Sequence, residues 1–217
     1  MKRRTLDLIV SVGGLVLAGL LLVVGLVLTS NANFANNYVH EQLSAQKIFF
    51  KSADTLTAEE KQQACLVQYA GQQLTTGAQA ECYANNFINV HLAGIAGGKT
   101  YAELGDVQTQ LRAQIATAQK NNDPNLAALQ KQLTDTTTNR ETVFKGETLR
   151  GLLLTSFGFS QFGEKAALAA TVAYLGSGLL ALLTLLGIIH AVRTPKTVAF
   201  AAPDVAARRP ERETVGV

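Results

Sequence analysis

Two long apolar runs constrain this chain more than any other feature of its sequence. Residues 8–28 and 166–192 contain no Asp, Glu, Lys or Arg. Each run has the roughly twenty residues that an α-helix needs to cross the hydrocarbon core of a bilayer. The sequence therefore predicts two transmembrane helices, with residues 29–165 held between them at one face of the membrane.

Composition averaged over the chain hides this division. The whole chain is 47% hydrophobic and 16% charged, but the apolar residues are concentrated in the two runs. Residues 30–165 hold 11 basic and 12 acidic side chains, which gives this segment a net charge of −1. Proteins that bind nucleic acid normally present a strongly basic surface. We therefore expect no nucleic-acid partner.

Basic residues beside the two runs predict the orientation, because juxtamembrane Lys and Arg resist translocation. We expect residues 1–7 and the Ala-, Pro- and Arg-rich tail 193–217 to be cytoplasmic, the tail also disordered, and residues 29–165 to be exoplasmic to the plasma membrane. The alternative is a signal peptide cleaved near residues 30–32, but the first run is longer than the usual 7–15 apolar residues of such peptides. The flanking basic residues are Lys2, Arg3, Arg4, Arg193, Lys196, Arg208, Arg209 and Arg212.

Small residues within the runs predict close helix packing, since helices in lipid associate through tight contact. In one interpretation the two spans pack on each other. In another they contact a partner membrane protein or a second copy of the chain. Asp7 and His190 lie at helix ends where the dipole favours their charges, and they could meet in an antiparallel pair. The helix-packing residues are Gly14 and Ala18 in the first run and Ala169, Ala173, Ser177 and Ala181, every fourth residue, in the second.

The segment between the runs shows helical spacing and no strand period, so we predict an all-α fold with an exoplasmic helical bundle. Helices are expected over residues 34–51, after an Asn-rich neck, and over 57–70 and 78–96, followed by a helical hairpin over 101–148. Capping boxes are expected at Thr57 with Glu60 and at Thr100 with Glu103. Thr136 and Arg140 interrupt the apolar spacing of the hairpin. Residues 149–163 are expected to bend at Gly158 and Gly163 and to descend to the membrane. The phenylalanines of this elbow, as candidate contacts for a lipid or another ligand, are Phe157, Phe159 and Phe162.

Two cysteines carry the clearest covalent prediction. Cys65 and Cys82 lie on consecutive predicted helices at similar distances from the turn that joins them. An oxidising exoplasmic compartment favours a disulfide between them. Metal ligation would need companion ligands, and redox catalysis would favour a CxxC motif. We therefore predict a structural disulfide.

Residues 93–100 fit a loose phosphate-loop pattern, but such a loop needs a strand before it. A helix precedes it here, and a glycine helix stop followed by a Thr100 cap explains the same residues. We therefore expect no nucleotide. His40 and His91 lack the spacing of a metal site with Glu41 or Glu81, and no nucleophile motif is present. We expect no catalytic residue, no metal and no cofactor, and hence no enzyme.

A resemblance to a known family rests on five short stretches, residues 1–8, 30–34, 79–83, 144–153 and 190–195. They make the chain similar to two-span membrane proteins from high-GC Gram-positive (actinobacterial) bacteria, a family with no established function. The resemblance implies topology and compartment. Members are sometimes labelled aromatic ring-opening dioxygenases, but that chemistry requires iron ligands that this chain lacks.

The sequence is compatible with more than one hypothesis for the function of this protein. The preferred one is a non-enzymatic scaffold or accessory subunit of the cell envelope, bound to membrane lipids and to a membrane-protein partner or a second copy. The alternative is an exoplasmic protein that binds or senses a small or lipidic ligand near the 149–163 segment. An apolar cavity there would favour ligand binding, a convex apolar patch would favour a scaffold, and converging His and carboxylate groups would favour catalysis.

Overall fold

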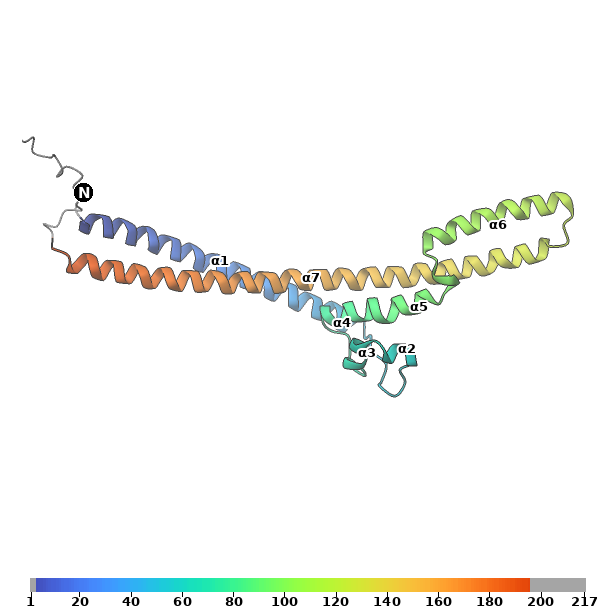
Figure 1. The fold of residues 1–217 in the computed structure, drawn as a ribbon, viewed down its shortest axis with the longest axis horizontal. Helices are drawn as coiled ribbons and strands as arrows, with labels where there is room; N and C mark the ends of the chain where they lie inside the picture. The colour runs from blue at the N-terminus through green and yellow to red at the C-terminus, as the bar shows by residue number, and fades with distance from the viewer. Residues whose placement is uncertain (1–2, 196–217) are drawn as a thin grey trace, which may run out of the picture. The chain divides into compact units, whose positions relative to one another are not determined.

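The computed structural model describes residues 3–195, and all its regular structure is helical (Figure 1). The chain divides into two compact units, of which residues 30–166 form one and residues 3–29 with 167–195 form the other. The predicted all-α class is confirmed. The predictions for Lys2, Lys196 and the tail from residue 196 onward lie outside the described residues.

Helix α1 (Arg3–Ala45) continues without a break through the region where we expected a neck. No glycine or proline occurs from residue 26 to residue 45, so the backbone meets no helix breaker. Ala32 and Ala35 are buried, whereas the asparagines between them and around them face outward. The helix ends at Ala45, six residues before the predicted end, where Lys47 adopts a positive φ of 53°.

Short helices replace the second long helix that we predicted over residues 57–70. Helix α2 (Ala58–Lys61) begins with the expected capping box, in which Thr57 and Glu60 satisfy each other's backbone N–H groups. Gln63 is extended with ψ of 98°, which ends this helical stretch before α3 (Ala64–Gln68) begins. The intervening extended residue explains why one apolar pattern forms two helices.

The predicted helix over 78–96 is present as three consecutive helical segments. These are α4 (Gly77–Cys82), a π-helix η1 (Tyr83–Ile88) and α5 (Asn89–Ala93). Thr76 and Gln79 form a second capping box at the start of α4, which we did not predict. A short 3₁₀ turn, η2 (Ala96–Gly98), follows and includes positive φ at Gly97 and Gly98.

The core of the 30–166 unit gathers around this helical run. The segment after α1 pairs in extended form with residues 71–74, through bonds from Phe50 N–H to the Gln72 carbonyl and from Leu74 N–H to the Ile48 carbonyl. This pairing folds the loop onto α4 and η1. The buried core residues are Val39, Leu43, Phe50, Leu66, Leu74, Ala80, Cys82, Ala84, Ile88 and Leu153.

The predicted helical hairpin is formed by α6 (Tyr101–Asn121) and the first part of α7 (Leu126–Arg193), which lie side by side in Figure 1. Thr100 and Glu103 form the expected capping box of α6. Arg140 donates a hydrogen bond to Gln108 Oε1 at 2.9 Å, and Gln108 in turn donates to Thr137 Oγ1 at 2.7 Å. A polar network therefore occupies the position where the apolar spacing is interrupted.

The bend predicted over residues 149–163 is wrong, because α7 is one continuous helix from Leu126 to Arg193. Gly163 serves close packing instead. A methyl group built there would lie 2.9 Å from Asn36 Oδ1 and 3.1 Å from Ala35 Cβ. The glycine thus lets α7 approach α1 closely within the 30–166 unit.

Gly77 has a similar role at the start of α4, and it yields a first prediction. A Cβ at this position would overlap Ser160 Oγ and would lie 3.4 Å from the Phe157 backbone. We expect Gly77→Ala to lower the free energy of unfolding by about 1–3 kcal/mol through overpacking. Thermal unfolding followed by the near-UV tyrosine signal would measure the change. Gly94→Ala is the matched control, because its Cβ would meet only an ordinary contact at 3.5 Å; equal effects of both changes would contradict the packing argument.

Candidate functional site

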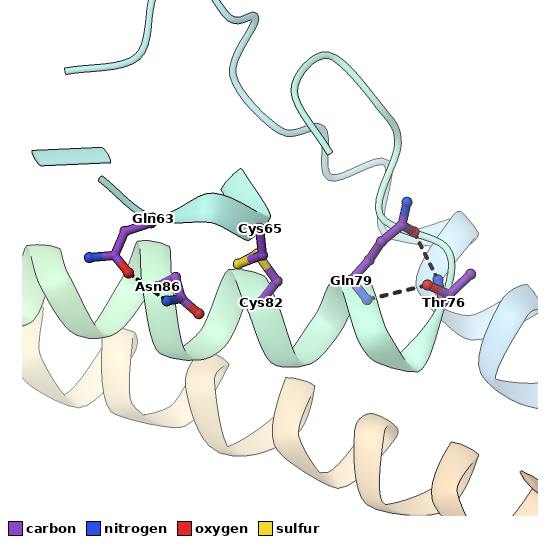
Figure 2. Close-up of a disulfide and its surroundings, with 6 residues drawn as sticks. All are labelled: Gln63, Cys65, Thr76, Gln79, Cys82 and Asn86. Carbon is purple, nitrogen blue, oxygen red and sulfur yellow. Dashed lines mark hydrogen bonds between the residues drawn. A yellow bond between two sulfur atoms is a disulfide. The ribbon is translucent and has the colours of Figure 1, made fainter. Parts of the chain in front are cut away.

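The predicted disulfide is confirmed. Cys65 on α3 and Cys82 at the end of α4 are bonded, with Cα atoms 6.0 Å apart. Figure 2 shows the bridge between the Gln63–Asn86 hydrogen bond on one side and the Thr76–Gln79 capping box on the other. Because both cysteines are bonded, the chain has no free thiol. The bridge therefore fixes the short helix α3 to the α4–η1 run.

A buried carboxylate, that of Glu60, lies at the centre of a charged cluster in the 30–166 unit. Its side chain is only 1% exposed. Oε1 lies 2.7 Å from Lys51 Nζ and 3.4 Å from His91 Nε2, while Oε2 accepts the Thr57 backbone N–H at 2.8 Å. The ring of Phe87 packs against both basic side chains: Lys51 Nζ lies 5.3 Å from its centroid, and the His91 ring centroid lies 4.4 Å from it. Three separate segments of the chain therefore meet at one carboxylate.

The electrostatics of this cluster keep Glu60 ionised. Burial raises the pKa of Glu60, but the hydrogen bonds from Lys51 and Thr57 and the charges of Lys51 and His91 outweigh it, so the pKa lies below its ordinary value. Burial, with the Glu60 charge as the smaller cause, raises the pKa of Tyr83. His91 Nδ1 lies 2.7 Å from the Phe87 carbonyl, which leaves Nε2 directed at Glu60. The arrangement is that of a structural ion pair with all polar partners in place.

Sequence reasoning identified Glu60 only as a helix cap. Its other partners, Lys51 and His91, are 9 and 31 positions away, and no sequence spacing pointed to them. Within residues 3–195, no three His, Cys, Asp or Glu side chains converge as a metal site would require. His40 lies in a different hollow, beside Glu164 and Ser160.

An apolar groove of about 380 Å³ runs between the end of α1 and the 149–159 part of α7. One end is marked by the rings of Tyr38 and Phe159, whose centroids are 5.7 Å apart, and Phe34 packs against both. The lining side chains are those of Tyr38, Val39, Gln42, Leu43, Gln46, Ile48, Leu149, Leu152, Leu153, Thr155, Ser156 and Phe159. This is a concave, mostly apolar surface of the kind that receives hydrophobic ligands.

The three phenylalanines predicted as one elbow have separate positions on α7. Phe159 lines the groove. The backbone of Phe157 faces Gly77 at the start of α4, and Phe162 is 75% exposed outside the groove lining. The continuous helix places them at different angles around its axis, so only Phe159 belongs to the concave site.

In the other unit, α1 and α7 pack antiparallel through small residues. The Ser177 hydroxyl donates to the Ala18 carbonyl at 2.8 Å, and a Cβ on Gly14 would lie 2.6 Å from Thr184 Oγ1. Ala173 and Ser177 are buried, but Ala169 and Ala181 are exposed. An every-fourth-residue line drifts around a helix of 3.6 residues per turn, so the contact line instead follows Ala170, Ser177, Thr184 and Ala191 at intervals of seven.

Asp7 and His190 meet near the ends of the same helix pair, as their positions in sequence suggested. Asp7 Oδ2 lies 3.0 Å from His190 Nδ1. Tyr174 and Thr29 share a hydroxyl hydrogen bond of 2.9 Å toward the opposite end. These contacts fix the register of the pair.

The phosphate-loop pattern over residues 93–100 is occupied by the end of α5, the η2 turn and the cap of α6. The Thr100 hydroxyl interacts with Glu103. A helix precedes the glycines where a phosphate loop needs a strand. This geometry agrees with the helix-stop interpretation of the motif.

Comparisons of the chain with protein-family models, with curated proteins and with solved structures returned no match.

Proposed function

We propose that this is a two-span integral membrane protein, with both termini cytoplasmic, whose exoplasmic 30–166 unit binds an apolar ligand in the groove between α1 and α7. Two helices, α1 and α7, are long and apolar enough to cross a membrane. The orientation rests on the basic residues that flank the runs. The same proposal holds that the first run is kept as a membrane span and is not cleaved as a signal peptide. It also includes the resemblance to the actinobacterial two-span family.

The distribution of side chains in the span pair supports a lipid environment. Only 17% of each apolar window is buried, whereas a core helix of a soluble protein would be mostly buried. The buried positions carry Ser, Thr, Ala and Gly, and the large apolar side chains face outward, which is the arrangement expected when the solvent is lipid. Leucines of the two runs that are more than half exposed include Leu15, Leu17, Leu20, Leu175, Leu179 and Leu182.

The groove is the single observation that favours ligand binding over the other hypotheses. It is concave and apolar, and it lies where a ligand-binding protein was expected to have a cavity. Removing an apolar ligand from water contributes roughly 25 cal/mol for each Å² buried, which is enough to drive binding without a charged contact.

A scaffold is the second candidate, and a different observation favours it. Phe34 and Phe162 are 62% and 75% exposed, and neither lines the groove. Exposed aromatic side chains are common anchors in protein interfaces. A partner protein that covers these rings would make the chain an accessory subunit.

The test uses affinity purification of the full chain in mild detergent, followed by mass spectrometry of retained small molecules, lipids and proteins. Leu149→Lys places a charge in the groove lining, and Gln130→Lys places the same charge on an exposed part of the same helix. Burying an unpaired ammonium group is unfavourable by at least about 1–3 kcal/mol, so we expect about tenfold or greater loss of the ligand from Leu149→Lys alone.

Two outcomes would contradict ligand binding. The first is the absence of any retained apolar molecule from the wild-type protein. The second is equal retention by both lysine variants. A protein partner that is captured reproducibly by wild type and by both lysine variants, and lost after Phe162→Ser, would instead support the scaffold.

A further inference from the structure

We infer that the occupant of the groove is one acyl chain of a membrane phospholipid, an inference that rests on the proposed function and specifies its ligand. The chemistry of the lining is the first reason. None of its twelve side chains is charged, and its polar members are two amides and two hydroxyls besides Tyr38. A fatty-acid carboxylate or a charged metabolite would find no counter-ion there, whereas a hydrocarbon chain needs none.

Other hollows of the described chain differ in this respect. Four further hollows of about 310–650 Å³ each include at least one charged lining residue. These residues are Asp123, Glu164, Glu81 and the group Arg112, Arg140, Glu141 and Lys145. The absence of charge therefore distinguishes the α1–α7 groove from hollows of similar size.

The shape of the groove suits a single extended chain. One wall is formed by residues 38–45 of α1 together with Gln46 and Ile48 just beyond its end, and the other by residues 149–159 of α7, which runs antiparallel to it. At the helical rise of 1.5 Å per residue, ten residues give a length of about 15 Å. Such a hollow accepts a flexible hydrocarbon chain along its length.

The lipid bilayer is also a nearby source of an apolar ligand, because few residues separate the groove from the two apolar runs. Phe34 follows residue 28 by six positions, and Phe159 precedes residue 166 by seven. Even a fully extended chain of this length would reach no more than about 25 Å. Only short stretches of chain therefore connect Phe34 and Phe159 to the two apolar runs. Tyr38, at the same end of the groove, is a residue type favoured at membrane interfaces.

The chain contains no tryptophan, so a single introduced tryptophan reports on one position. Leu152→Trp places the probe in the groove lining, where the native side chain is 63% exposed and a larger ring can fit. Tyr101→Trp on α6 and Phe162→Trp outside the groove lining provide comparison probes. Each full-length variant is placed in phosphatidylcholine bilayers whose acyl chains carry bromine, which quenches tryptophan only at short range.

We expect brominated chains to remove most of the fluorescence of Leu152→Trp and little of that of Tyr101→Trp. Adding Leu149→Lys should restore the fluorescence of the Leu152→Trp probe and leave Phe162→Trp unchanged, because only the groove is blocked. Adding Gln130→Lys should change neither probe.

The inference is overturned if brominated chains leave Leu152→Trp as bright as Tyr101→Trp. It is also overturned if Leu149→Lys has no effect on the quenching of Leu152→Trp, since the probe would then simply lie in the bilayer. If quenching is absent while mass spectrometry still finds an apolar molecule lost from Leu149→Lys, the lipid assignment fails and ligand binding stands. If both are absent, the proposed function fails as well.

Discussion

Replacing Cys65 and Cys82 together by serine is expected to destabilise the 30–166 unit by about 3 kcal/mol. In the chain-entropy account, the bond removes the freedom of a loop of 17 residues from the unfolded state. That loop contributes Leu66, Leu74 and Ala80 to the core. Without the bond, folding must therefore overcome more conformational entropy to order these core residues. The near-UV tyrosine signal during thermal unfolding should shift down by roughly 6–12 °C.

Reduction of the wild-type protein supplies the control for this prediction. A thiol reductant should bring the wild-type midpoint toward that of the double-serine variant and should leave the variant itself unchanged. A variant with the wild-type midpoint would show that the bond contributes nothing beyond the contacts around it.

Glu60→Ala is expected to have an effect of similar size, about 2–4 kcal/mol, because it removes two kinds of interaction at once. The carboxylate caps α2 through the Thr57 N–H, and it pairs with Lys51 and His91. Lys51 is 36% exposed and can turn to solvent, which keeps the loss below that of a fully buried pair. Thermal unfolding in the same assay measures it.

Glu60→Gln separates the cap from the charge. Glutamine can preserve a capping box, as Gln79 does with Thr76 in this chain. The amide loses the ion pairs, so we expect Glu60→Gln to be destabilised by less than Glu60→Ala. An equal loss in both variants would mean that the charge, and not the cap, accounts for the effect.

The same carboxylate predicts a dependence on pH. The pKa of Glu60 is lowered from its ordinary 4.5 in the folded protein. The stability it contributes is therefore fully present above about pH 4.5 and is lost as the pH falls through the folded-state value. Glu60→Gln should reduce the acid-induced loss of stability. Glu103→Gln is the comparison, because the pKa of the exposed Glu103 is also lowered, by hydrogen bonds from Thr100; a larger effect from Glu103→Gln would contradict the role given to Glu60.

Local signals in the sequence were sufficient for part of the fold. The capping boxes at Thr57 and Thr100 are present, and Cys65 and Cys82 are bonded. The expected bend is absent because Gly158 and Gly163 permit a turn but do not require one, and α7 gains close packing against α1 by remaining helical at Gly163. The helix expected over 57–70 is divided in two because Gln63 is extended, a break that apolar periodicity does not reveal.

The sequence by itself determined the all-α class, the two apolar runs and the disulfide, since each follows from residue type and short-range spacing. Only the tertiary structure decided which residues share a site. It joined Lys51, Glu60 and His91, and it placed Phe159 in a groove and left Phe162 outside the lining. It also moved the contact line between α1 and α7 from Ala169 and Ala181 to Ala170 and Thr184. These choices depend on the register and rotation of packed helices, which are set by contacts between residues far apart in the chain.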